Sequence, residues 1–130
     1  MIALDTNVLV RFITEDDPRQ AAASRALLAT PGETFYVSDI VLVELSWVLR
    51  SVYRFRREEV GAVLRALLDR VDFVVADREG VQAAVRHLAA GGDLADALLL
   101  AEARRHGCAR LATFDEELTK RDPGFALAPR

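Results

Sequence analysis

The chain has 130 residues, of which 52% are hydrophobic and 28% charged, a balance typical of one globular domain (1–130) and contrary to disorder. Its formal net charge of −3 excludes a global basic field for nucleic acid, and no apolar run approaches the roughly 20 residues of a membrane helix. Cys108 is the single cysteine, so we expect no internal disulfide. The start does not resemble an export signal, and together with the single cysteine this favours a cytoplasmic location.

Strands and helices are expected to alternate along the chain. Apolar segments rich in β-branched and aromatic residues predict strands at 2–4, 34–38, 72–76 and 109–114, with a short edge strand at 124–128. Helical periodicity predicts helices at 7–14, 16–29, 40–53, 56–70, 78–90 and 94–106. This alternation favours an α/β domain with a small parallel sheet and helices packed on its faces.

Several residues are expected to mark helix ends or a packing face. Asp17 followed by Pro18 is typical of a helix start, Asp39 is expected to cap the helix at 40–53, and Gly107 to end the helix at 94–106. One stripe of the helix at 56–70 is apolar, and it serves either to pack on the sheet or, in part, to bind a second copy; its residues are Val60, Val63, Leu64, Leu67 and Leu68.

Two carboxylates directly follow expected strands. Asp5 ends the strand at 2–4, and Asp115 follows the strand at 109–114. Ligands of parallel α/β sheets bind at the carboxyl ends of the strands. If these two strands are parallel neighbours, both carboxylates lie on the same rim of the sheet.

Two helical acids are candidates for the same rim. Glu44 is the only charge in "IVLVELSWVL", and its helical neighbours include Ile40 and Trp47, so we expect it to be buried and paired, protonated or metal-bound. Asp96 lies in the first turn of a helix that is apolar on most sides, whereas Asp93 has the position of an ordinary N-cap.

The four acids Asp5, Glu44, Asp96 and Asp115 are therefore expected to form one constellation. Four carboxylates cannot share a pocket as anions without a cation, and an all-oxygen set suits Mg²⁺ or Mn²⁺. Neither His87 nor His106 has the position of a ligand, and Cys108 is expected to be a small buried residue. A carboxylate-held Mg²⁺ chiefly serves reactions of phosphate groups.

The basic residues are almost all arginine, with Lys120 the single lysine. Four of them gather in mid-chain: Arg50, Arg54, Arg56 and Arg57. Arginine suits bidentate contacts to phosphate, although a solvated helix end is an equally good interpretation of the cluster alone.

The segments "IALDTNVLVRFIT", "VLVELSWVL", "DLADALLLAEARRHG" and "LATFDEEL" resemble the successive motifs of PIN-domain ribonucleases, and among these the VapC-type toxins of toxin–antitoxin pairs. The resemblance covers nearly the whole chain. It implies a three-layer α/β/α sandwich, usually dimeric, and a metal-dependent endoribonuclease that leaves a 5′-phosphate and a 3′-hydroxyl. It also implies an antitoxin partner.

The resemblance assigns roles to particular residues. The acidic motif positions fall on the same four carboxylates, which would hold Mg²⁺ or Mn²⁺: Asp5, Glu44, Asp96 and Asp115. Asn7 and Thr113 match polar positions that assist the site, and Asp93 matches a position that is frequently acidic.

Three other functions are alternatives to the nuclease. A haloacid-dehalogenase-like phosphatase needs a second Asp two residues after the first, where this chain has Asn7. A response-regulator receiver needs a mid-chain phospho-acceptor Asp at a strand end, which is not found. A catalytically idle PIN scaffold that binds a partner protein stays open, because intact acids do not prove turnover.

Overall fold

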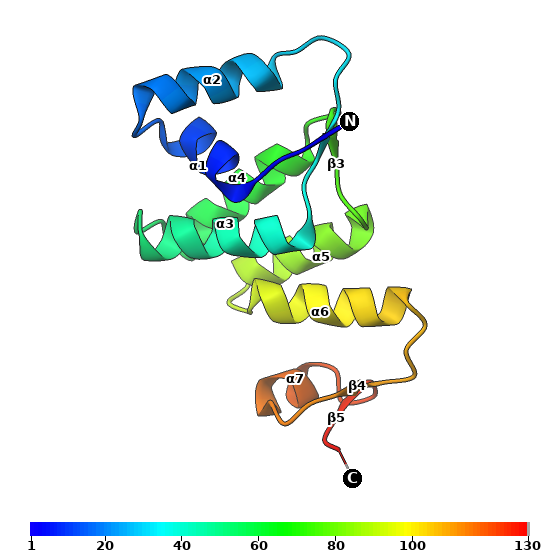
Figure 1. Ribbon diagram of the computed structural model, residues 1–130. Coiled ribbons are helices and arrows are strands. Elements are labelled where there is room, and N and C mark those ends of the chain that lie inside the picture. Colours follow the sequence, from blue (N-terminus) through cyan, green and yellow to red (C-terminus); the bar gives the residue numbers. More distant parts are fainter. Residues whose placement is uncertain (130) are drawn as a thin grey trace.

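Helices dominate the computed structural model, which describes residues 1–129 (Figure 1). The helices are α1 (Thr6–Thr14), α2 (Pro18–Leu28), α3 (Asp39–Ser51), α4 (Arg57–Leu68), α5 (Arg78–Ala89), α6 (Leu94–Arg105) and α7 (Glu116–Arg121). The strands are β1 (Ile2–Ala3), β2 (Phe35–Tyr36), β3 (Phe73–Val74), β4 (Leu111–Ala112) and β5 (Ala126–Leu127). The α/β class and the small parallel sheet are confirmed.

The strands form two separate parallel sheets within the described part of the chain. One has the order β1-β2-β3, in which Phe35 of β2 pairs with Ile2 and Phe73; the other joins β4 and β5. The strands before Asp5 and Asp115 are therefore not neighbours, contrary to the sequence-based expectation. In Figure 1 the segment from β4 to β5, with α7, lies beyond α6 and away from the larger sheet.

The apolar core follows the same division. The larger cluster joins the three-stranded sheet to the helices of the first hundred residues, with Phe35 and Leu64 among its fully buried side chains. A smaller cluster holds the C-terminal segment against α6 through Leu100, Leu118 and Phe125. The C-terminal segment thus depends on one face of α6 for its burial.

The helix ends follow local sequence in most places. Asp17 caps α2 by accepting the Gln20 N–H at 3.1 Å, and Gly107 has a left-handed φ of +73° just after α6. At α3 the N-cap is Ser38, which accepts the Val41 N–H at 3.3 Å; the expectation that Asp39 is the cap was wrong by one residue. None of the helices in residues 1–129 has the length and apolarity needed to cross a bilayer.

The apolar stripe of α4 belongs to the core. Val60, Leu64, Leu67 and Leu68 are buried, and Val63 packs against the same cluster. Because this surface is already covered within one copy of the chain, it is not available for self-association. The packing alternative for this stripe is confirmed.

We expect Leu64→Ala to lower the free energy of unfolding by about 2–5 kcal/mol, because Leu64 is 0% exposed and its loss leaves a cavity. Val71→Ala, at a fully exposed position, is the control and should change stability by less than about 0.5 kcal/mol. Urea denaturation measures both variants. An unchanged unfolding midpoint for Leu64→Ala, with altered sedimentation, would instead assign the stripe to an interface.

Candidate functional site

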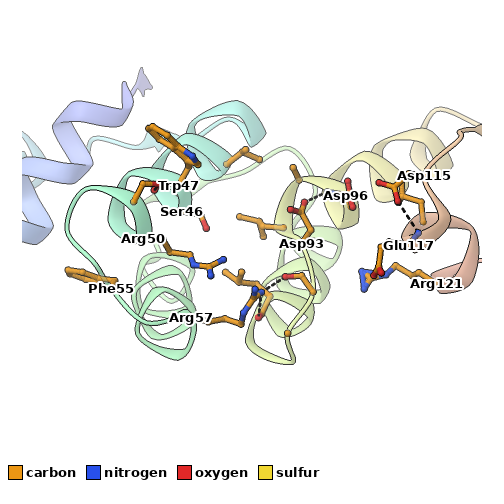
Figure 2. A pocket seen from close by; sticks show the side chains of 18 of the residues that line it. Ser46, Trp47, Arg50, Phe55, Arg57, Asp93, Asp96, Asp115, Glu117 and Arg121 are labelled. Carbon is orange, nitrogen blue, oxygen red and sulfur yellow. Dashed lines mark hydrogen bonds between the residues drawn. The ribbon is translucent and has the colours of Figure 1, made fainter.

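A cleft of about 830 Å³ lies between the end of α3, the start of α6 and helix α7 (Figure 2). Its walls differ in charge. One wall, here called the arginine wall, is contributed by α3 and the turn that follows it and includes Trp47, Arg50, Arg54 and Phe55. The other, here called the acidic wall, includes Asp93, Asp96, Asp115 and Glu117. Phosphate chemistry next to a bound cation would need both kinds of group.

Helix starts position the acidic wall. Asp93 is the N-cap of α6 and accepts the backbone N–H of Asp96 at 2.8 Å, as the sequence indicated. Asp115 is the N-cap of α7 and accepts the Glu117 N–H at 2.9 Å, while the Thr113 hydroxyl accepts the Asp115 N–H at 2.9 Å. Thr113 therefore orients the segment that carries Asp115.

The carboxylates of the acidic wall repel one another. Partial burial raises the pKa of Asp96 above its ordinary value, and the negative charges of Asp93, Asp115 and Glu117 raise it further. The guanidinium of Arg121, which also lines the cleft, opposes this increase. The wall is thus an electrostatically strained anionic surface that a cation would relieve.

Asp5 and Glu44 lie elsewhere and are connected through one threonine. Asp5 caps α1 by accepting the Thr6 N–H at 2.8 Å, and the buried Thr6 donates its hydroxyl to Glu44 Oε2 at 3.2 Å. Neither Asp5 nor Glu44 lines the cleft. Asn7, at the start of the same helix, is exposed.

The prediction that Glu44 is buried was wrong. Glu44 is exposed, and of the neighbours that should have enclosed it Ile40 is 71% and Trp47 64% exposed, although Val41 is buried. Helix α3 instead buries the opposite stripe, which contains Leu42, Leu45 and Leu49. The side chain of Glu44 thus needs no partner to compensate for burial.

The four predicted ligands form two groups in this structure. Asp96 and Asp115 share the acidic wall, whereas Asp5 and Glu44 share Thr6. Across residues 1–129 no three potential ligand side chains come together in a way that would hold a metal ion. The donor chemistry suits Mg²⁺, but the arrangement does not form a complete centre.

The sequence reasoning did not identify three features of the site. Thr6, inside the quoted "LDTN", connects two of the acids; Glu117 adds a carboxylate to the acidic wall; and Trp47 is exposed rather than packed. Cys108 was expected to be buried but is exposed. A residue two positions after a strand-end acid, such as Glu117, could have been flagged from its spacing alone.

The chain belongs to the PIN domain family, whose pattern it matches over residues 2–122. It is also similar to a protein named "VapC ribonuclease" from Aquifex aeolicus (strain VF5), with 24% identity over 123 residues that cover 92% of this chain and 91% of that protein. No solved structure matches the chain significantly.

We expect Asp96→Asn to stabilise the metal-free protein at neutral pH, because it removes one of several mutually repelling charges. The pKa of Asp96 is raised in the folded state, so the fold favours the protonated acid and loses stability as pH rises through the folded pKa. The advantage of the Asn variant should therefore be largest at neutral pH and shrink toward the ordinary value of 3.8. Urea denaturation in EDTA across this pH range measures it.

Glu79→Gln is the matched control, since Glu79 also lies in the first turn of a helix, α5, but away from the cleft. Loss of its favourable interaction with the helix dipole should cost about 0.3–1 kcal/mol. If Asp96→Asn destabilises the protein in the same way, Asp96 acts only as a helix-start residue.

Proposed function

We propose that the chain is a single-domain, metal-dependent endoribonuclease that acts as the toxin of a type II toxin–antitoxin system. It would hydrolyse RNA phosphodiester bonds and leave a 5′-phosphate and a 3′-hydroxyl. The observation that carries the proposal is the cleft of a PIN-domain chain in which Asp96 and Asp115 face Arg50 and Arg54. The name of the Aquifex relative supports the same activity.

The metal would be Mg²⁺ or Mn²⁺, held by Asp96 and Asp115 and completed by Asp5 and Glu44. When bound, such an ion activates water and neutralises charge on a phosphodiester oxygen. The chain's own contribution is the fixed orientation of Asp115 by Thr113 and of Asp5 by the start of α1. Asn7 and Asp93 are supporting residues in this proposal.

A centre that contains all four acids requires the two sheets to join. β1 pairs only with β2, and β4 only with β5, so each has one free edge within the described residues. Asp5 lies two residues beyond β1, and Asp115 three residues beyond β4. We infer that parallel pairing of β4 with β1, if it formed, would bring both acids to one rim of a continuous sheet.

A pair of introduced cysteines tests whether β4 can pair with β1, which is here called closure. In a Cys108→Ser background, Ala3→Cys with Ala112→Cys should form an intramolecular disulfide, and faster with Mn²⁺ present, because the cation attracts both acidic groups. Ala112→Cys with Leu127→Cys, which are paired in register in the structure, is the positive control. Crosslinking of the control alone, with or without Mn²⁺, would count against closure.

We expect the purified protein to cleave single-stranded or looped RNA with Mg²⁺ or Mn²⁺ and to lose cleavage in excess EDTA. The wild type should melt at a higher temperature with Mn²⁺, because a cation that binds only the folded state stabilises it. Asp96→Asn should gain less from Mn²⁺ and lose nearly all cleavage. Wild-type cleavage by a folded Asp96→Asn protein would remove Asp96 from the metal site.

The same variant separates the nuclease from its alternative, a catalytically idle scaffold that only binds a partner protein. A scaffold would tolerate Asp96→Asn without any loss of function and would show no RNA cleavage with either metal. The phosphatase alternative is weaker, because Asn7 occupies the position where that chemistry needs a second Asp.

We also propose a cognate antitoxin, a homodimer and a cytoplasmic location. An inserted Arg or Lys from the antitoxin would suit the acidic wall, where it could pair with Asp96.

Because the stripe of α4 is covered, a homodimer would use another surface. Sedimentation of the chain alone, and with the product of a neighbouring small gene, tests both partners; a monomer in both samples would exclude them.

A further inference from the structure

We propose that the arginine wall of the cleft binds a single-stranded segment of RNA, with one unpaired base stacked on the indole of Trp47 and the adjoining phosphates on Arg50 and Arg54. This inference deepens the proposed function, on which it rests, by naming the residues that position the substrate. The acidic wall opposite would then receive the phosphodiester to be cut.

Trp47 is a large aromatic residue on the surface of α3. Its side chain is 64% exposed. Exposure of so large an aromatic surface to water is unfavourable unless another molecule covers it. Trp47 lies on the face of α3 that also carries Val43 and Arg50, one helical turn before and after it, and all three line the cleft. Figure 2 shows Trp47 and Arg50 on the same helix at the rim of the cleft.

The arginines near the cleft differ in whether their side chains already have protein partners. Arg57 donates to the carbonyl oxygens of Leu88 and Gly92, and Arg56 pairs with glutamates of its own helix. In contrast, Arg50 and Arg54 are exposed and make no side-chain hydrogen bond or ion pair with residues 1–129. Two unpaired guanidinium groups beside an exposed indole leave their binding capacity for an external anion.

The backbone at Arg54 has an uncommon conformation. Its φ is +60°, in the left-handed region that glycine or asparagine occupies at lower cost. Selection for stability alone would favour glycine at this turn. Glu15 has a similar φ of +55° after α1 and outside the cleft, so the role assigned to Arg54 rests on its unpaired guanidinium at the cleft and not on its backbone conformation.

The chemistry of the wall favours single-stranded RNA over other occupants. Every base has a face that stacks on an aromatic ring, and a cationic groove follows the phosphates, which is how single strands are bound without a fixed sequence. In a duplex the bases are stacked inside and cannot reach Trp47. A protein partner docked on the exposed apolar face of α3 would cover Ile40 as well as Trp47, whereas a strand bound in the cleft would leave Ile40 exposed.

The chain offers a direct measurement, because Trp47 is its single tryptophan. In EDTA, where no cleavage interferes, an oligoadenylate RNA of about twelve nucleotides should quench the Trp47 fluorescence, and a duplex of equal length should not. Trp47→Ala should weaken binding about tenfold, measured by anisotropy of labelled RNA, whereas Trp47→Phe should keep most of the affinity.

Arginine variants test the phosphate contacts. Arg50→Gln and Arg54→Gln should each weaken binding and reduce its dependence on salt concentration, since each removes one neutralised phosphate. Arg19→Gln, on the exposed surface of α2 and outside the cleft, is the control and should bind RNA as the wild type does.

Two results would overturn the inference. One is an unquenched Trp47 with equal RNA affinity for wild type and Trp47→Ala; the other is a Trp47→Ala variant that changes sedimentation but not RNA affinity, which would assign the residue to a protein interface. A failure of the proposed function would give a different experimental result from a failure of this inference. Quenching with no cleavage in Mg²⁺ would refute the nuclease and keep the RNA surface.

Discussion

The central strand β2 fixes the geometry on which the rest of the larger sheet depends. Its Phe35 is fully buried and packs edge-on against Phe73, with ring centres 6.1 Å apart. The backbone of this segment bonds to both neighbours, through Ile2 N–H to the Thr34 oxygen and Phe35 N–H to the Asp72 oxygen. Since each strand has only two residues, these few bonds set where β1, β2 and β3 end. The end of β1 places Asp5, and the end of β2 starts the helix that carries Trp47.

Most of the fold could be predicted from the sequence because local patterns determine it. Strands were expected at all five observed places and helices at six of the seven in residues 1–129. Helix α7 was missed, since its six residues bury only Leu118 and show no apolar period. The separation of β4 from β1 was also missed. Alternation of strands and helices predicts parallel strands but does not say which of them pair, because pairing depends on how the helices between them pack.

Of the four acids predicted to form one site, two lie on the same wall of the cleft and two lie elsewhere. Strand-end and helix-start positions identified Asp96 and Asp115, which do share a wall. Glu44 was placed wrongly because α3 has two apolar faces, and a helical wheel cannot say which one is buried. The face with Leu42, Leu45 and Leu49 was selected by the packing of α3 on its neighbouring helices α1, α4 and α6, and that choice left Trp47 and Glu44 on the outside.

Under the proposed function, the division of charge across the cleft would make binding and cleavage depend on metal in different ways. Without a cation, Asp96 and its acidic neighbours repel a polyanion, while Arg50 and Arg54 attract it, so RNA would be held at one wall only. A bound divalent cation would neutralise part of the negative charge of the acidic wall and supply a local positive centre for a phosphate, so that the same strand could span the cleft. Recognition would then reside in residues of α3 and its following turn, whereas the chemistry would reside in the segments around α6 and α7. A net charge of −3 is consistent with this division, because the attraction for RNA needs only a local cationic surface and not a basic protein.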